Sequence, residues 1–260
     1  MNRLYYIILT WLSFIFMFSL NALANYLPLN GYNTGALSAL YPNKFVPDGF
    51  TFSIWGVIYM WLLVFVGYTN KLLIYLPEID ERVKRVKFIL PLFWISCLLN
   101  GSWILSWHYL NLPLSLIIMV LLLWTLISLF VRINKKKAHP RKRDHLLVEV
   151  PFIIYLGWIS VATIANTTAL LVNYDWNGFG ISDTNWSILM MAIAGVLGVL
   201  FSLKWHRPAY TLVICWALWG IFRSQGELEK NIGYASIFLL AICLVFAFRE
   251  LVTPKRGWQN

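Results

Sequence analysis

Charged residues are scarce in this chain, at 12% of the total, and they are missing from the middle of its long apolar runs. Ion-driven pumps and transporters carry protons or ions on Asp, Glu, Lys or Arg side chains within their membrane spans. The lack of such residues disfavours a driven transporter, while passive or ligand-gated movement remains open.

Residues and motifs of metal and soluble enzyme chemistry are also few. The 3 cysteines form no Cys-x-x-Cys pair and the 4 histidines are scattered, so no metal site is predicted. A haem-ligand role for His108 stays as an alternative. The P-loop, the His-Glu-x-x-His motif and paired carboxylates within an apolar run are all absent. No catalytic residue is predicted, and a non-enzymatic role is favoured.

Long apolar runs, by contrast, recur along the whole chain, and 60% of the residues are hydrophobic. A helix needs roughly 20 mainly apolar residues to cross a bilayer. The sequence therefore predicts an all-α, polytopic integral membrane bundle of about eight transmembrane helices. The expected spans are residues 4–27, 50–76, 88–110, 112–133, 148–172, 186–203, 209–222 and 232–251. The seventh of these runs is short for a span.

The net charge of +10 comes from basic residues that are spread over the ends of these runs. Positive residues in short loops stay on the cytoplasmic side, and near the surface they attract anionic lipid headgroups. Of the 21 Lys and Arg residues, the opposite loops keep only Lys44, Arg223 and Lys230. We therefore expect a multi-pass protein of the plasma (inner) membrane with both termini in the cytoplasm, membrane lipids as partners and no nucleic-acid partner.

The apolar run from 150 to 172 carries, on one helix face, a stripe of residues that differ from the surrounding apolar ones. Tyr155, Trp158, Ala162 and Asn166 follow one another at steps of three, four and four, and Asn173 follows seven residues later. In hydrocarbon a carboxamide must find a hydrogen-bond partner or a wet cavity. This face is therefore expected to look into a protein interior in which a ligand can sit.

Aromatic and amide residues gather in two earlier runs as well. Phe52, Trp55 and Tyr59 open the second run, and Asn100 and Trp103 share a face of the third. An interfacial aromatic belt explains tryptophans near the ends of the runs. It explains Trp103 and Trp158 less well, and for these two residues helix packing and pocket lining both remain open.

These patterns together resemble the TspO/MBR family of tryptophan-rich sensory proteins, also called translocator proteins or peripheral benzodiazepine receptors. Three signatures of that family agree in order along residues 4–173. They are Phe52-x-x-Trp55-x-x-x-Tyr59, then Asn100-x-x-Trp103, then Pro151 followed by Tyr155-x-x-Trp158-x-x-x-Ala162-x-x-x-Asn166.

The resemblance implies a five-helix bundle, often dimeric, whose pocket takes porphyrins, haem, sterols or synthetic aromatic ligands. Porphyrin or haem would then be a ligand and not an obligatory cofactor. Flat ligands stack on Trp and Tyr, while amides bind their polar rims. The ligand-binding residues implied are Trp55, Tyr59, Asn100, Trp103, Tyr155, Trp158 and Asn166.

The chain also departs from the family. Residues 45–48 read Phe-Val-Pro-Asp where the family has Trp-x-Pro-Pro, and the run 112–133 lacks the usual Asp. Ser96 stands roughly where the family often has Gln. The missing loop tryptophan is associated with light-dependent porphyrin breakdown in some members, so porphyrin degradation is disfavoured here.

Two domains are predicted: a five-helix bundle at 1–173 and a three-helix membrane extension at 174–260. The extension is expected to cover the surface that other members use to dimerise, which would make this protein a monomer. The leading function is binding, sensing or passive movement of a hydrophobic, tetrapyrrole-like small molecule. Two alternatives stay open: an integral membrane enzyme acting on an isoprenoid or pigment, and a structural partner of another membrane complex.

Overall fold

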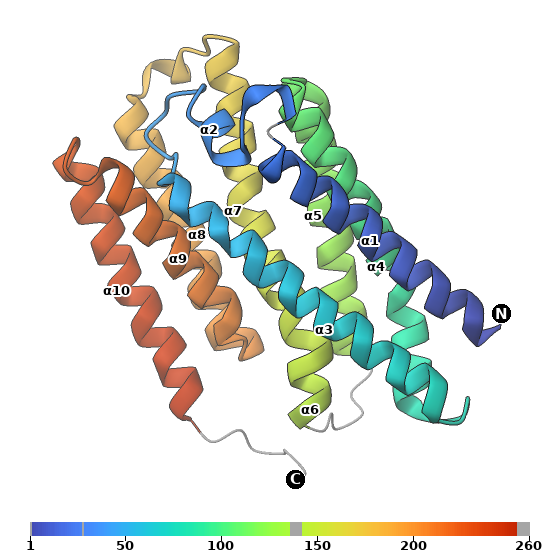
Figure 1. Cartoon of the computed structure of the whole chain (residues 1–260). Coiled ribbons are helices and arrows are strands. Elements are labelled where there is room, and N and C mark those ends of the chain that lie inside the picture. The colour runs from blue at the N-terminus through green and yellow to red at the C-terminus, as the bar shows by residue number, and fades with distance from the viewer. Residues whose placement is uncertain (1, 28, 136–141, 254–260) are drawn as a thin grey trace.

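The computed structural model describes residues 2–27, 29–135 and 142–253, and every regular element among them is helical. Figure 1 shows the long helices side by side in one bundle. They are α1 (Arg3–Tyr26), α3 (Ile54–Tyr75), α4 (Glu81–His108), α5 (Leu112–Lys135), α7 (Val150–Asn173), α8 (Asp183–Trp205), α9 (Pro208–Gln225) and α10 (Lys230–Val252). Short elements join them: η1 (Leu29–Gly31), α2 (Thr34–Ser38), η2 (Gly49–Ser53), α6 (Lys142–Asp144), η3 (His145–Glu149) and η4 (Gly178–Gly180).

Within the described residues, 7 helices are long and apolar enough to cross a membrane, which confirms the predicted polytopic helical fold. The predicted short run 209–222 corresponds to α9, which is not among these 7. Its 18 residues give a length of about 27 Å, slightly less than the roughly 30 Å of a hydrocarbon core. Helix α9 packs against α7, α8 and α10, and it also exposes Leu212 and Trp219.

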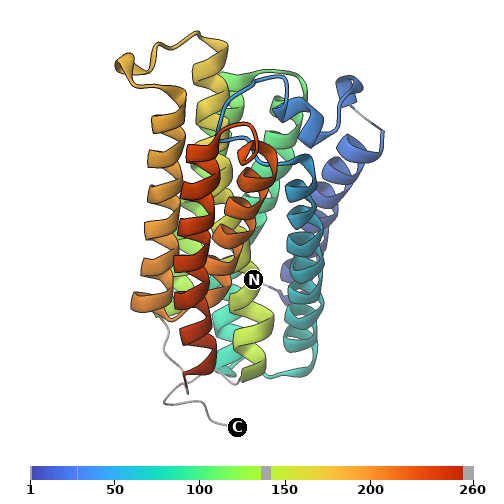
Figure 2. The same ribbon diagram turned by 90° about the vertical axis from the view of Figure 1, so that its left-hand side faces the viewer.

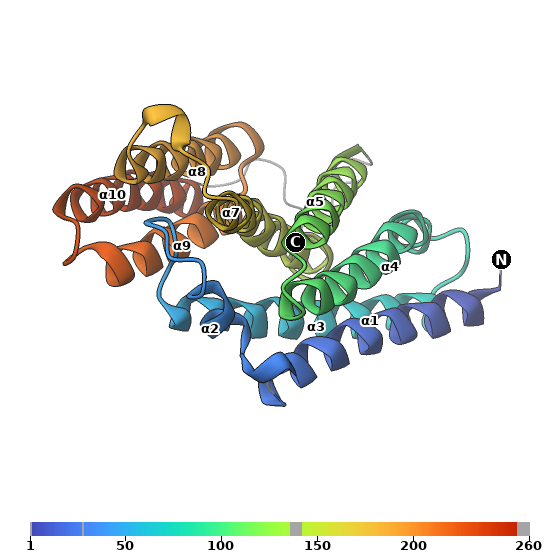
Figure 3. The same ribbon diagram turned by 90° about the horizontal axis from the view of Figure 1, so that it is seen from above.

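The bundle has two flanks that meet at α7. Seen from above, α7 lies between α5 on one side and α8, α9 and α10 on the other (Figure 3). Figure 2 shows α8 and α10 side by side at one flank, with α1 and α3 at the opposite flank. A Cβ added to Gly157 of α7 would lie 3.1 Å from Val213 Cβ of α9, so the small residue permits this close contact. The predicted domain division after residue 173 falls directly after α7 and stays a prediction.

Local sequence signals account for several helix ends. The carboxylate of Asp80 accepts a hydrogen bond from the Arg82 amide at 2.9 Å and caps α4, and Ser182 caps α8 in the same way. Pro208 occupies the start of α9, where its missing N–H has no helical partner to lose. His206 ends α8 with φ of 54°, a left-handed conformation that stops the helix.

Both described chain ends lie at the same end of the bundle (Figure 1). Arg3 Nε pairs with Glu78 of the α3–α4 loop at 2.7 Å, and hydrogen bonds from Lys87 and Arg3 lower the pKa of the Glu78 carboxyl. His206 Nδ1 lies 2.7 Å from Glu250 near the end of α10. The loops predicted to be cytoplasmic therefore gather at one end, and the side of the membrane that this end faces stays a prediction.

Candidate functional site

An aromatic cluster forms where α3, α4 and α7 meet. Trp55 is its centre: it stacks on Tyr59, with ring centroids 5.5 Å apart, and lies 5.7 Å from Trp103. From α7, Tyr155 and Trp158 meet the same ring edge-on at 6.1 and 6.2 Å. All five side chains are buried. The structure thus brings together the aromatic residues that helical spacing and the family resemblance singled out.

Asn100 of α4 forms hydrogen bonds to three other helices, α1, α3 and α7. Its Nδ2 donates to the Tyr155 hydroxyl at 2.8 Å, and its Oδ1 accepts from Asn21 Nδ2 at 2.7 Å and from the Tyr59 hydroxyl at 3.4 Å. Asn21 of α1 was not predicted as part of the site. The argument that identified Asn166 applies to it too, because Asn21 is a carboxamide within an apolar run.

Asn166, the second predicted amide, joins α4, α5 and α7. Its Oδ1 accepts from Trp103 Nε1 at 3.0 Å, and its Nδ2 donates to Ser115 Oγ at 3.0 Å. Ser115 of α5 was missed, because a serine in an apolar helix usually bonds its own backbone, as this one also does with the Leu112 carbonyl at 2.9 Å. The side chains of Asn100 and Asn166 therefore form hydrogen bonds between helices, and these bonds fix the shape of the cluster.

A small cavity of about 30 Å³ remains beside Trp103 and Asn166. It offers room for about one water molecule. Trp107 and Trp158 both line it, and their buried indole N–H groups have no acceptor among the described residues. A buried donor without a partner costs about 1–3 kcal/mol. This cavity is therefore the place in the cluster where a hydrogen-bond acceptor would be stabilised.

A short segment covers the cavity. The cap, residues 34–53, includes α2 and η2 and places Thr34, Ser38, Pro47 and Phe52 on the cavity wall. Phe52 meets Trp158 edge-on, with ring centroids 6.0 Å apart. With these residues in place, the cavity has room for about one water molecule.

The cap is held by α9. The Asp48 amide donates to the Gly220 carbonyl at 3.0 Å, and Trp216 Nε1 donates to the Thr51 carbonyl at 2.8 Å. A Cβ added to Gly220 would lie 2.0 Å from Thr51 Oγ1, so only glycine permits this approach. One of the last three helices therefore touches the cover of the aromatic cluster.

His108 is fully buried beside the cap, and both of its ring nitrogens are engaged. Nδ1 lies 3.1 Å from the Leu29 carbonyl, and Nε2 lies 3.3 Å from Thr34 Oγ1. The ring thus holds the segment that leads into the cap. Among residues 2–27, 29–135 and 142–253, no group of three His, Cys, Asp or Glu side chains could hold a metal ion.

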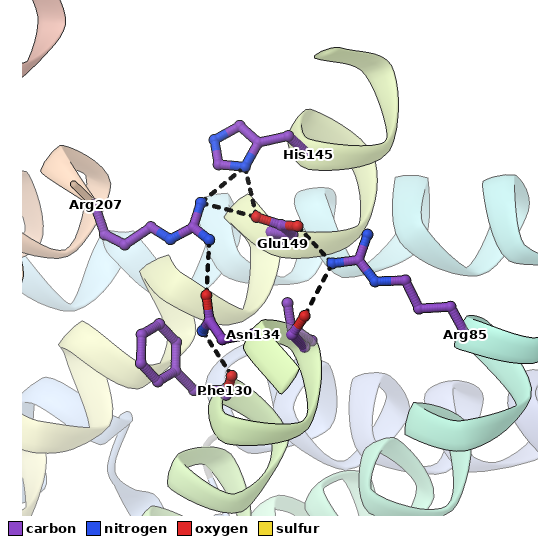
Figure 4. Close-up of polar contacts among 7 residues, drawn as sticks. Arg85, Phe130, Asn134, His145, Glu149 and Arg207 are labelled. Atoms are coloured by element: carbon purple, nitrogen blue, oxygen red, sulfur yellow. Dashed lines mark hydrogen bonds and ion pairs between the residues drawn. The ribbon is translucent and has the colours of Figure 1, made fainter. Parts of the chain in front are cut away.

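A buried cluster of ion pairs lies at the opposite end of α7 (Figure 4). Glu149 accepts from Arg85 Nη2 at 2.5 Å, from His145 Nδ1 at 2.6 Å and from Arg207 Nη1 at 2.8 Å. Arg207 Nη2 also donates to Asn134 Oδ1 at 2.9 Å. These contacts join α4, α5, η3 and the residue that precedes α9.

The fold and the cluster define an integral membrane protein, a helical bundle with an aromatic, amide-linked interior. The family described as TSPO-like protein matches residues 7–249, and the chain belongs to this family. The match runs through α8, α9 and most of α10, so it includes the last three helices as well as the first five spans. The comparisons found no match among curated proteins or among solved structures.

Proposed function

We propose that the aromatic cluster binds a flat hydrophobic ligand of the tetrapyrrole type, which the protein senses or passively moves. The observation that carries this proposal is that Trp107 and Trp158 both line this cavity and that their indole N–H groups have no acceptor in the described part of the chain. A ligand with carbonyl or carboxylate acceptors would satisfy these donors, and its ring system would stack on the surrounding aromatic side chains.

Ligand binding in this cluster requires the cap to move. The cavity of about 30 Å³ is far smaller than the roughly 300–1,000 Å³ of small-molecule sites. The structure therefore corresponds to a closed state, and a ligand would shift the population toward an open one. Because the cap contacts α9 at Gly220, opening it also changes a contact made by the last three helices. Such a coupling suits a sensor.

The test is a titration of the purified protein with protoporphyrin IX and with haem in the dark. Trp158→Phe removes one unpartnered donor and keeps a ring, so the affinity should fall about 2- to 13-fold, the value of one hydrogen bond of roughly 0.5–1.5 kcal/mol. Trp124→Phe is the matched control, since Trp124 is exposed on α5 and should leave the affinity unchanged.

Two results would contradict the proposal. One is the absence of saturable binding of either compound by the wild type. The other is an affinity that stays equal in folded Trp158→Phe and in the wild type. Either result would assign the cluster to helix packing, and the alternatives of an enzyme or a structural partner would then be tested with membrane extracts and by co-purification.

We further propose that the protein is a monomer with both termini in the cytoplasm. Helices α8, α9 and α10 cover one flank of α7, and basic loops gather at the end that carries both termini. A detergent-corrected mass of one chain would support the monomer, and a mass of two chains would contradict it. Reporter fusions at either terminus would check the orientation.

A further inference from the structure

A second and larger cavity lies between α7 and α8, on the face of α7 opposite the aromatic cluster. Its volume is about 270 Å³. Thr163, Ile164 and Thr167 of α7 form one wall, and Ser187 and Met190 of α8 form another. The α7 residues on this wall are half-exposed, unlike the buried first half of the helix. The α7–α8 cavity is therefore open to the surface of the bundle, along two helices that belong to candidate membrane spans.

The middle of this cavity is suited to hydrocarbon. The hydroxyls of Thr163, Thr167 and Thr168 donate to carbonyls of their own helix at 2.7, 2.8 and 2.9 Å. Their hydroxyl protons are thus already used in hydrogen bonds within α7, and the wall presents methyl groups and aliphatic chains to the cavity. Trp186 Nε1 is committed as well, because it donates to the Gly178 carbonyl at 2.8 Å. An acceptor-rich ligand would therefore find no free threonine hydroxyl along the α7 wall.

One end of the cavity is polar. Lys44 lies there with Nζ 2.9 Å from Thr184 Oγ1 and 2.8 Å from Glu229 Oε2, and Asp183 lies exposed in the first turn of α8. Trp176 and Trp186 line the same end, with ring centroids 5.4 Å apart. Tryptophans at a helix end are typical of the bilayer interface, so this end is at headgroup depth and the apolar wall extends toward the bilayer core.

We propose that the α7–α8 cavity holds one hydrocarbon chain of a bilayer lipid, with the polar part of the lipid at Lys44 and Asp183. The volume, near the lower limit of roughly 300–1,000 Å³ for small-molecule sites, fits a single chain and not a broad macrocycle. Lys44, which also pairs with Glu229, and Asp183 place charges of both signs at the mouth, and these match a zwitterionic headgroup. Helix α7 separates this site from the aromatic cluster, while the cap contributes to both, since Lys44 and Phe45 line the α7–α8 cavity.

The test is native mass spectrometry of the purified, delipidated protein after exchange into vesicles of a single zwitterionic phospholipid. The wild type should retain one lipid molecule per chain. Thr167→Trp fills the α7–α8 cavity and should lose this lipid. Val120→Trp adds the same ring to the exposed face of α5 and should retain it. Trp158→Phe should retain it too, which separates a failure of this proposal from a failure of the aromatic site.

A second measurement leaves the α7 wall of the cavity unchanged. A phospholipid brominated along its chain should quench the fluorescence of Trp176 and Trp186. The fraction of the total tryptophan fluorescence that is quenched should be smaller in a Trp176→Phe, Trp186→Phe double variant. No retained lipid in the wild type, equal retention in folded Thr167→Trp, or retention of a compound that is not a lipid would overturn the proposal. An unquenched Trp176 and Trp186 pair would overturn it as well.

Discussion

The two halves of α7 differ in how tightly they are packed. From Val150 to Val161 nearly every side chain is buried, whereas from Ala162 onward most are half-exposed. The first half begins at the Glu149 ion pairs and meets α9 at Gly157. The second half lies between the two cavities. One helix thus carries the fixed end of the bundle and contributes to both candidate ligand sites, and Tyr155 and Trp158 of its buried first half belong to the aromatic cluster.

The two cavities beside the second half differ in turn. The small one has unpartnered indole donors and almost no room, while the larger one has room and threonine hydroxyls that are already committed. The first favours a ligand with acceptors that opens the cap, and the second favours a hydrocarbon chain that needs no hydrogen bond. The following substitutions test this contrast between fixed and open regions, from the largest expected effect to the smallest.

Glu149→Ala should have the largest effect, a loss of about 3–5 kcal/mol in the free energy of unfolding. The substitution leaves the buried Arg85 and the partly buried Arg207 near each other without their shared carboxylate. Chemical unfolding in detergent measures the loss, and Glu227→Ala, at an exposed loop position, is the control. A loss below about 1 kcal/mol would mean that apolar packing alone fixes this end of the bundle.

Gly220→Ala should destabilise the protein by about 1–3 kcal/mol, because the new methyl group overlaps Thr51 and separates the cap from α9. Protoporphyrin association should become faster as the cap opens. The matched control is Gly56→Ala on α3, where an added Cβ meets nothing within 4 Å. An association rate equal to that of the wild type would show that the cap does not limit entry.

Asn166→Leu should cost about 1–3 kcal/mol, since Trp103 Nε1 then becomes a buried donor without a partner and Ser115 loses a bond. Asn173→Leu, at an exposed position on the same helix, should cost much less. Thermal unfolding of the two variants provides the comparison. Equal losses would contradict the role assigned to the Asn166 hydrogen bonds.

Helical spacing was sufficient to predict which residues of α7 share the cluster. Tyr155, Trp158 and Asn166 lie on one face because a helix repeats every 3.6 residues, and apolar runs of known length set the spans. Because a carboxamide in hydrocarbon needs a hydrogen bond, the sequence predicted that Asn166 would have a hydrogen-bond partner. It could not predict Ser115 as that partner, because the rotation of α5 depends on packing over its whole length.

Contacts between distant segments could not be predicted from the sequence for the same reason. The approach of Gly220 to Thr51 depends on where α9 crosses the cap, and no local signal records that crossing. The α7–α8 cavity likewise exists because α8 packs mainly on α9 and α10 and only lightly on α7. Patterns along one helix predict its faces, while the spaces between helices depend on all of their neighbours.

Tyr210→Phe should have the smallest effect, about 0.5–1.5 kcal/mol, although the residue lies in the fixed region. Its hydroxyl donates to Ser160 Oγ at 2.9 Å and so joins α9 to α7. The loss stays small because Ser160 keeps its own bond to the Leu156 carbonyl at 2.8 Å, and the ring keeps its stacking on Phe201. Tyr234→Phe, at an exposed position of α10, should change nothing measurable. A loss as large as that of Glu149→Ala would mean that the α7–α9 contact, and not the ion pairs, fixes the first half of α7.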